Sequence, residues 1–173
     1  MPVKALVAYA TRYGSTEEVA KAVAATLKES GFTVDLRFLR DVRKLEGYQA
    51  VVLGAPLFMF HWHKDALGFL GRQQAALTQM PVAIFVLGPV HEPHDEAEWK
   101  DSWAQLDKEL APFPWLEPLA LEMFGGKYDP EKLGFPLKMF AGKEPASDLR
   151  DWDAIRRWAS EVGEKFQQAL AGG

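Results

Sequence analysis

The segment that most constrains the fold of this chain is residues 7–23, where a buried apolar run leads through a hydroxyl-rich turn into a helical pattern. The nearly uninterrupted apolar run over residues 3–9 predicts a strand covered on both faces. The next apolar side chains recur with the period of a helix: Val19, Ala20, Val23, Ala24 and Leu27. Ser15 is expected to cap this helix, with Glu18 as its capping-box partner. A buried strand that leads directly into a helix predicts an α/β fold.

The turn between this strand and this helix has the composition of an anion site. Thr11, Ser15 and Thr16 carry hydroxyls that can donate to phosphate oxygens. The free N–H groups and the positive dipole end of the helix also favour an anion, so no lysine is required. The alternative is that Ser15 merely caps the helix while the threonines fill the turn. The residue types alone favour this alternative.

Strand and helix patterns alternate along the rest of the chain. Residues 32–38 alternate apolar with polar side chains, which is typical of an edge strand, and Gly31 is expected to end the helix before them. Buried strands are expected at three apolar runs: residues 50–53 (stopping at Gly54), 82–87 and 119–124. Helices are expected at three amphipathic segments: residues 64–77, 99–110 and 152–166. This alternation predicts a single domain over residues 1–173, with a five-stranded parallel sheet in the order 2-1-3-4-5 and helices on both faces.

Composition excludes several classes of function. The chain has no cysteine, which excludes disulfides, thiolate nucleophiles and cysteine-ligated metal centres, so redox chemistry would require an organic cofactor. A net charge of −4 argues against nucleic acid as a partner. The sequence has neither an N-terminal signal segment nor an apolar run approaching the roughly 20 residues that span a bilayer. A cytoplasmic location is therefore expected.

Three loops are expected to meet at one edge of the predicted sheet. In open parallel sheets, ligands lie beyond the carboxyl ends of the strands, where the direction of winding reverses. The loops that reach this edge are residues 11–16, 55–63 and 88–95. The first carries hydroxyls, the second is dense in aromatic side chains, and the third is a turn. Phosphate contacts beside an aromatic slot favour a flat heteroaromatic nucleotide as the ligand.

All the histidines of the chain fall on the second and third of these loops: His61, His63, His91 and His94. Histidines at such spacings can bind zinc, but neither pair has helical i, i+4 spacing and the nearest carboxylates, Asp65 and Asp95, are typical of a surface. We therefore predict no metal site. Two interpretations stay open, namely loop histidines without a chemical role and proton donors beside a cofactor. His61, His63 and His91 are the candidates for the second.

The first turn resembles the FMN-phosphate signature of the flavodoxin family at Val7, Tyr9, Thr11, Gly14, Thr16, Ala20 and Val23, with Ala8 as the one departure. It lacks the G-x-G-x-x-G fingerprint of dinucleotide sites and the Gly-Lys-Ser/Thr of a Walker loop. The resemblance covers nearly the whole chain. It implies a flavodoxin-like three-layer sandwich with FMN as the cofactor. The implied FMN contacts are Thr11, Arg12, Tyr13, Gly14, Ser15, Thr16, Pro56, Leu57, Phe58, Met59, Phe60, Trp62, Gly88, Pro89, Val90 and His91.

Within that family the chain looks most similar to the menaquinone-dependent protoporphyrinogen dehydrogenase branch. The similarity rests on Gly54-Ala55 followed by His61 and His63, and on a lengthened segment before the final helix. It implies an FMN-dependent oxidoreductase with a quinone or redox-protein partner. The alternatives are a small electron-transfer flavodoxin without its own substrate and an interaction module that has lost its cofactor. The mild net charge disfavours a strongly acidic carrier, and the intact phosphate-type turn disfavours the interaction module.

Two further segments carry predictions. Phe60 stands where the family often has glycine, which tolerates the left-handed backbone that lets this loop hydrogen-bond the flavin semiquinone. A bulky side chain disfavours that backbone, so we expect two-electron reduction of the flavin. Residues 127–149 form an unusually long connection, expected to contain a short helix from Asp129-Pro130 through Phe140. Its apolar side chains are expected to pack against the domain. Contact with a partner or a membrane surface is the alternative, and a homodimer also stays open.

Overall fold

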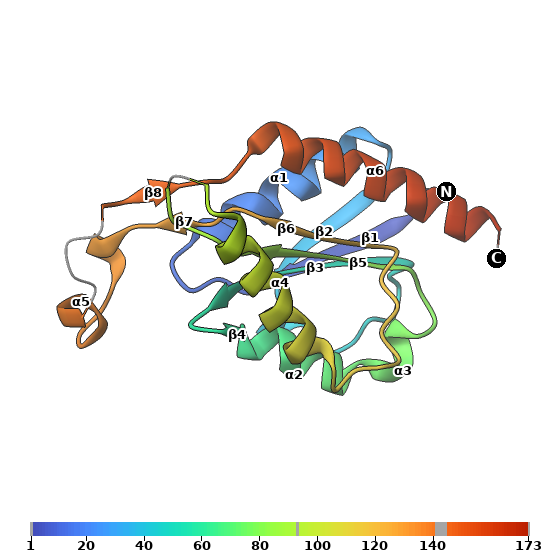
Figure 1. Ribbon diagram of the computed structural model, residues 1–173. Helices are drawn as coiled ribbons and strands as arrows, with labels where there is room; N and C mark the ends of the chain where they lie inside the picture. The colour runs from blue at the N-terminus through green and yellow to red at the C-terminus, as the bar shows by residue number, and fades with distance from the viewer. Residues whose placement is uncertain (1, 93, 141–144, 173) are drawn as a thin grey trace.

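A parallel sheet forms the middle layer of the molecule, in a computed structural model that describes residues 2–92, 94–140 and 145–172 (Figure 1). Its five main strands are β1 (Lys4–Tyr9), β2 (Thr33–Phe38), β3 (Ala50–Phe58), β5 (Val82–Leu87) and β6 (Ala120–Phe124). They lie in the order β2-β1-β3-β5-β6, and each pair of neighbours is parallel. The predicted order 2-1-3-4-5 and the edge position of the second strand are confirmed. A two-residue strand, β4 (His61–Trp62), pairs antiparallel with the end of β3.

Helices cover both faces of the sheet and bury an apolar core on each (Figure 1). One face carries α1 (Ser15–Glu29) and α6 (Trp152–Ala171), and the other carries α2 (Lys64–Arg72), α3 (Gln74–Leu77) and α4 (Glu96–Leu110). Alternate residues of each strand point to opposite cores, so Val7 packs toward α1 while Leu6 packs toward α2. Trp99 and Trp103 of α4 pack against the second core. The predicted helix over residues 64–77 is divided at Gln73 into α2 and α3.

The third strand does not stop at Gly54, as the sequence suggested, but continues to Phe58. Gly54 faces the ring of Phe85 on the neighbouring strand, and a Cβ at this position would lie 1.9 Å from Phe85 Cζ. The glycine is therefore required by packing between strands and does not mark a strand end. The longer strand carries Pro56 to Phe58 out to the edge where the loops meet.

The predicted capping box of the first helix is wrong. Helix α1 begins at Ser15 itself, and its N-cap is Gly14, whose φ is 95°. The nearby side-chain acceptor is Thr11, whose Oγ1 accepts the Gly14 N–H at 2.8 Å. At the other end, the C-cap is Ser30, one position earlier than the predicted Gly31, which follows it with φ 99°.

Residues 127–140 and 145–150, which we together call the ribbon segment, extend from the carboxyl end of the sheet (Figure 1). They form the antiparallel pair β7 (Lys127–Tyr128) and β8 (Ser147–Asp148), with a 3₁₀ turn (Pro130–Lys132) and α5 (Leu137–Phe140) between them. The single helix expected from residue 129 is thus wrong. Phe135 and Met139 are 83% and 70% exposed, so the prediction that they pack against the domain is also wrong. The side chain of Phe140 and residues 141–144 lie outside the described residues.

Candidate functional site

A cavity of about 620 Å³ lies at the carboxyl ends of the strands. Three of its walls come from the loops that follow β1, β3 and β5, as the sequence predicted, and α4 and the ribbon segment complete it. Most of the predicted cofactor residues line this cavity: Arg12, Tyr13, Ser15, Pro56, Leu57, Phe58, Met59, Phe60, Gly88, Pro89, Val90 and His91. The other predicted contacts, Thr11, Gly14, Thr16 and Trp62, lie outside its lining.

The phosphate loop, residues 11–16, contains one fully buried hydroxyl. Thr16 is fully buried, and its Oγ1 has no hydrogen-bond partner within the part of the chain that the structure describes. Buried polar groups are almost always paired, so an orphan of this kind requires an explanation. The hydroxyl sits in the first turn of α1, where free N–H groups favour an anion. These residues therefore fit the phosphate of a nucleotide.

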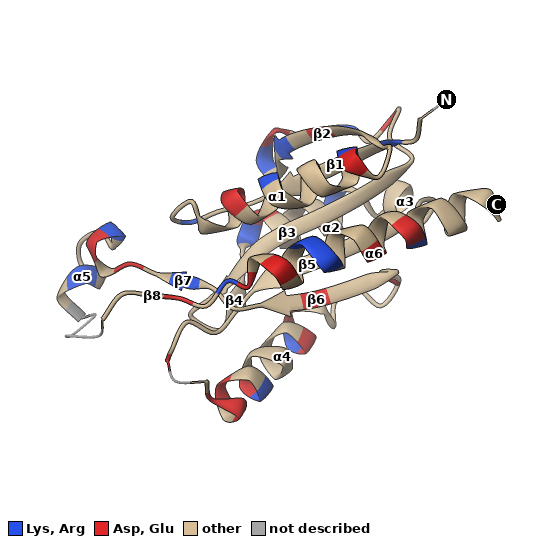
Figure 2. Cartoon of the chain, turned by 90° about the horizontal axis from the view of Figure 1, so that it is seen from above, with Lys and Arg blue, Asp and Glu red and all other residues tan. Residues whose placement is uncertain are grey.

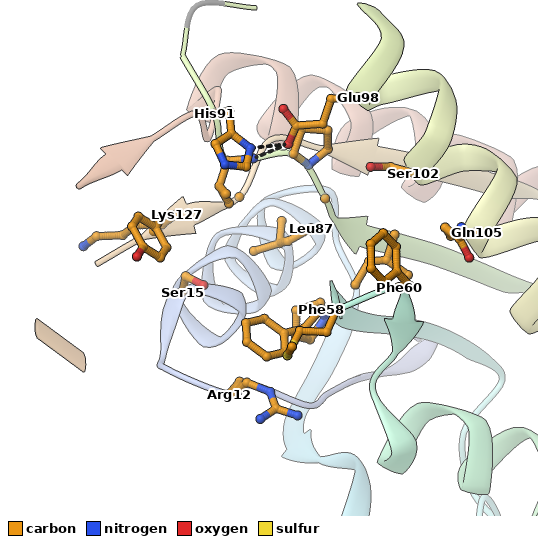
Figure 3. Close-up of a pocket in the computed structure, with 18 of the residues that line it drawn as sticks. Arg12, Ser15, Phe58, Phe60, Leu87, His91, Glu98, Ser102, Gln105 and Lys127 are labelled. Carbon is orange, nitrogen blue, oxygen red and sulfur yellow. Dashed lines mark hydrogen bonds and ion pairs between the residues drawn. The ribbon is translucent and has the colours of Figure 1, made fainter. Parts of the chain in front are cut away.

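Aromatic contacts join the phosphate loop to the second loop. The guanidinium of Arg12 lies over the ring of Phe58 at 4.4 Å from its centroid, and the ring of Tyr13 meets Phe58 edge-on at 6.1 Å. Figure 3 shows Arg12 and Phe58 across the cavity from His91 and Glu98. Aromatic side chains and the guanidinium of Arg12 therefore line this side of the cavity.

The second loop is a tight hairpin between β3 and β4. Phe58 pairs with His61, which leaves Met59 and Phe60 as the two turn residues. Both have positive φ, 48° and 71°. A type I′ turn requires this geometry and normally uses Asn-Gly. Phe60 therefore already adopts the left-handed backbone that the sequence argument expected it to avoid, and that argument for two-electron reduction loses its premise.

Trp62 belongs to the core beneath this hairpin. It is 1% exposed, and its indole N–H donates to the carbonyl oxygen of Ala55 at 3.1 Å. Its backbone N–H donates to Glu109 Oε2 at 3.1 Å, and the other oxygen of Glu109 lies 3.2 Å from His61 Nδ1. No sequence pattern indicated a role for Glu109. Its two contacts hold β4 against α4.

The four histidines do not form one cluster. His63 is the N-cap of α2, where its Nδ1 accepts the Asp65 N–H at 3.1 Å, and burial lowers its pKa. His61 is largely exposed beside Glu109, and His94 stacks on Trp99. Only His91 among them lines the cavity. Among the residues that the structure describes, no three histidine, aspartate or glutamate side chains are placed to hold a metal ion.

His91 forms a pair with a carboxylate that sequence analysis overlooked. Its Nδ1 lies 3.0 Å from Glu98 Oε1, and the same oxygen accepts the Val90 N–H at 3.2 Å (Figure 3). Glu98 belongs to a polar face that lines the cavity at helical spacing, formed by the N-cap Asp95 and by Glu98, Asp101, Ser102 and Gln105 of α4. Figure 2 shows acidic residues at the N-terminal end of α4. The signal was present in the sequence as the polar side of the helix that carries the two tryptophans.

The strand order, the hydroxyl-bearing turn before α1 and the cavity at the strand ends define a flavodoxin-like protein. A family model described as a flavodoxin domain matches residues 6–140. The chain therefore belongs to the flavodoxin family, and FMN is its cofactor, as predicted. The orphan hydroxyl of Thr16 and the aromatic side of the cavity at Phe58 fit that cofactor.

Relatives and solved structures agree with this assignment. Protoporphyrinogen IX dehydrogenase [quinone] from Escherichia coli (strain K12) is 26% identical over 92% of this chain and 94% of its own length. A flavodoxin from the domain Archaea has a TM-score of 0.59 and 16% identity, covering 95% of this chain and 99% of its own. Flavodoxin 1 from Bacillus cereus has a TM-score of 0.58 and 18% identity, covering 93% and 97%. These two structures bear on the fold alone. Within the described residues, we find no helix long and apolar enough to cross a membrane.

Proposed function

We propose that this flavodoxin-like oxidoreductase oxidises its own organic substrate and passes the electrons to a quinone. The observation that carries the proposal is the extent of the cavity, which continues past the three cofactor loops onto the polar face of α4 and the ribbon segment. A carrier that exchanges electrons with another protein needs an accessible flavin edge but no walled compartment beside it. The relative named protoporphyrinogen IX dehydrogenase [quinone] supports both the substrate class and the acceptor.

The chain's own residues have distinct tasks in this proposal. FMN, when bound, supplies the two-electron chemistry between the substrate and the quinone. Residues 11–16 would hold its phosphate, since the Thr16 hydroxyl has no hydrogen-bond partner among the described residues. Residues 56–60 and 88–91 would flank its ring, because they line the cavity on two sides. The polar face of α4 would then orient the substrate.

His91 is our candidate for proton transfer. A substrate that loses two electrons in a dehydrogenation also loses two protons, and reducing a quinone to a hydroquinone consumes two. Imidazole is suited to such exchange near neutral pH. Glu98 would fix the orientation of the His91 ring, since its Oε1 lies 3.0 Å from Nδ1. His61 and His63 lie outside the cavity lining, which makes them weaker candidates.

A small electron-transfer flavodoxin is the second candidate. Met59 and Phe60 are 61% and 71% exposed at the margin of the cavity, and neighbouring apolar side chains at a surface are typical of partner contacts. The two functions differ in one experiment. We would mix the FMN-loaded protein anaerobically with protoporphyrinogen IX and a soluble naphthoquinone, and record porphyrin fluorescence. Catalysed porphyrin formation that requires the quinone supports the enzyme, whereas its absence contradicts the enzyme and favours the carrier.

Peripheral membrane contact is part of the same proposal, because natural quinones reside in the bilayer. The exposed Phe135 and Met139 lie in the ribbon segment together with Lys132 and Lys138, a combination suited to an anionic membrane surface. Flotation with anionic vesicles should recover the parent protein and lose the Phe135→Ser/Met139→Ser variant. Equal recovery of both would count against this contact. The cytoplasmic location and the homodimer stay predictions, which fractionation and sedimentation can test.

A further inference from the structure

Arg150 is a buried cation at the end of the ribbon segment. Among the residues that the structure describes, it is the one charged residue that is buried. Only 3% of its side chain is exposed. Its guanidinium makes a bidentate pair with Asp148, with Nε to Oδ1 and Nη2 to Oδ2 both at 2.9 Å. It also lies over the ring of Trp152, 4.8 Å from the centroid. This planar, two-point geometry is specific to arginine and holds the side chain in one orientation.

The remaining nitrogen of Arg150 reaches the first turn of α1. Its Nη1 donates to the carbonyl oxygen of Ser15 at 3.2 Å and lies 3.6 Å from Glu18 Oε2. Ser15 is the first residue of α1, and the orphan hydroxyl of Thr16 follows it. Arg150 thus connects the ribbon segment to the phosphate loop across 135 positions of sequence.

The charge of Arg150 also matters at this position. The first turn of α1 carries Glu17 and Glu18, which would repel an anion bound there. Glu17 accepts a hydrogen bond from Tyr9 Oη at 2.9 Å, and Glu18 is the carboxylate that Arg150 faces. Hydrogen bonding to Asp148 raises the pKa of Arg150, so the guanidinium stays charged. Loss of this cation would leave one additional negative charge near the phosphate loop.

Other residues of the ribbon segment make parallel contacts with the cofactor loops. Lys132 Nζ donates to the carbonyl oxygen of Tyr13 at 3.2 Å, and Ser147 Oγ donates to the carbonyl oxygen of Val90. The ribbon segment therefore touches the first and the third loop of the site at separate points. A loop held at several points retains its geometry when no ligand is present, which lowers the entropy lost on binding.

We infer that Arg150 is a positioning residue for the phosphate of FMN. It holds the start of α1 in the geometry that receives the phosphate and offsets the charge of Glu18. The ribbon segment thereby acts as a clasp on the cofactor loops, a role beyond any contact with substrate or membrane. The inference rests on FMN being held through its phosphate at residues 11–16.

The test compares FMN with riboflavin, which has the same ring and no phosphate. We would titrate the apoprotein with each flavin by fluorescence quenching, for the parent and for Arg150→Met, Arg150→Lys and Arg156→Met. Arg150→Met should weaken FMN binding roughly tenfold or more and leave riboflavin binding within about twofold, since the lost interactions act on the phosphate. Arg150→Lys, which keeps the charge without the two-point geometry, should give an intermediate FMN preference. Arg156 is the matched control, because it is an exposed arginine of α6 paired with Asp153.

Each outcome has a defined meaning. Equal weakening of FMN and riboflavin by Arg150→Met would overturn the inference and leave Arg150 with a purely structural role. If Arg150→Met does not fold, as judged by circular dichroism, Arg150→Lys decides by the same ratio, and an unchanged ratio overturns the inference. Thr16→Val tests the phosphate site separately. If Thr16→Val lowers the FMN preference and the Arg150 variants do not, the site stands and only the role of Arg150 fails.

Discussion

The two loops that flank the proposed flavin position solve the same backbone problem in opposite ways. The phosphate loop needs one residue with positive φ and uses Gly14, at φ 95°. The hairpin needs two and uses Met59 and Phe60, at 48° and 71°. A left-handed backbone costs a non-glycine residue about 1–2 kcal/mol. Sequence and backbone therefore agree in the first loop and conflict in the second, and such conflicts are concentrated at functional sites.

The two loops also differ in what they leave unsatisfied. The phosphate loop buries a hydroxyl that has no hydrogen-bond partner among the described residues, whereas the hairpin exposes two large apolar side chains. The hairpin keeps its strained turn because its second strand is fixed: Trp62 is buried beneath it and Glu109 accepts the Trp62 N–H. A polar ligand would thus pair the hydroxyl of the phosphate loop, and an apolar ligand would cover the exposed side chains of the hairpin.

Thr16→Val should separate affinity from stability. Removing the hydroxyl takes away a hydrogen bond to a charged phosphate, which should weaken FMN binding roughly ten- to a hundredfold. The apoprotein should be at least as stable as the parent, because a buried unsatisfied group is lost. Flavin titration and urea unfolding of the apoprotein measure the two effects.

Thr26→Val is the matched control for that experiment, in the same helix. The hydroxyl of Thr26 is satisfied by the carbonyl oxygen of Ala22 at 3.0 Å and lies far along α1 from the phosphate loop. Its loss should leave FMN affinity unchanged. Parent-like FMN binding by Thr16→Val would show that the phosphate lies elsewhere.

Gly14→Ala should destabilise the apoprotein by about 1–2 kcal/mol, the cost of a left-handed alanine. A Cβ at Gly14 would meet no atom within 4 Å, so the effect isolates the backbone from packing. The measurement is urea unfolding without flavin. Gly71→Ala, in α2, also meets no atom within 4 Å but has no positive φ, so it should not destabilise. Equal effects of the two substitutions would contradict the backbone explanation.

The sequence predicted the phosphate loop better than the hairpin for a physical reason. The strand, the turn hydroxyls and the helix of the phosphate loop are adjacent in the chain, so local pattern determines them. The course of β3 past Gly54 depends on Phe85, and the hairpin depends on Glu109, neither of which is near in sequence. Local patterns therefore predicted the end of the strand too early and predicted a loop where the structure has a hairpin.

The same limit explains which site residues were overlooked. Glu98, Glu109 and Arg150 are charged residues in or beside helices, where charge usually marks a solvated face. The contacts that connect them to the site span 7, 47 and 135 positions, to His91, Trp62 and Ser15 respectively. The predicted residues that line the cavity come instead from loops at the carboxyl ends of strands, a position that topology alone identifies. The histidines were grouped because their loops are neighbours, yet His63 turns away to cap α2.

Phe60→Gly should have the opposite sign to Gly14→Ala. Glycine relieves the left-handed strain, while its greater freedom in the unfolded chain offsets part of the gain, leaving a net stabilisation of about 0.5–1 kcal/mol. Little burial is lost, because Phe60 is 71% exposed. Urea unfolding of the apoprotein gives the answer, with Phe135→Gly as a control at an exposed phenylalanine without positive φ. A destabilised Phe60→Gly protein would mean that the side chain makes a stabilising contact that outweighs the strain.

The smallest expected effect concerns the residue that follows the hairpin and begins α2. His63 accepts the Asp65 N–H with its neutral imidazole, and burial lowers its pKa below the usual value of about 6.5. Its contribution to stability is therefore fully present above pH 6.5 and is lost as the pH falls toward the lowered pKa. Asparagine is also a good N-cap but does not titrate, so His63→Asn should match the parent at pH 8 within a few tenths of a kcal/mol. At pH 5.5 the parent should have lost more stability than the variant, because protonation removes the acceptor at the helix start. Since the two proteins differ only at this position, the difference between their pH profiles reports His63 alone. Parallel urea-unfolding profiles from pH 8 to 5.5 would show that His63 does not hold this end of the hairpin through its neutral form.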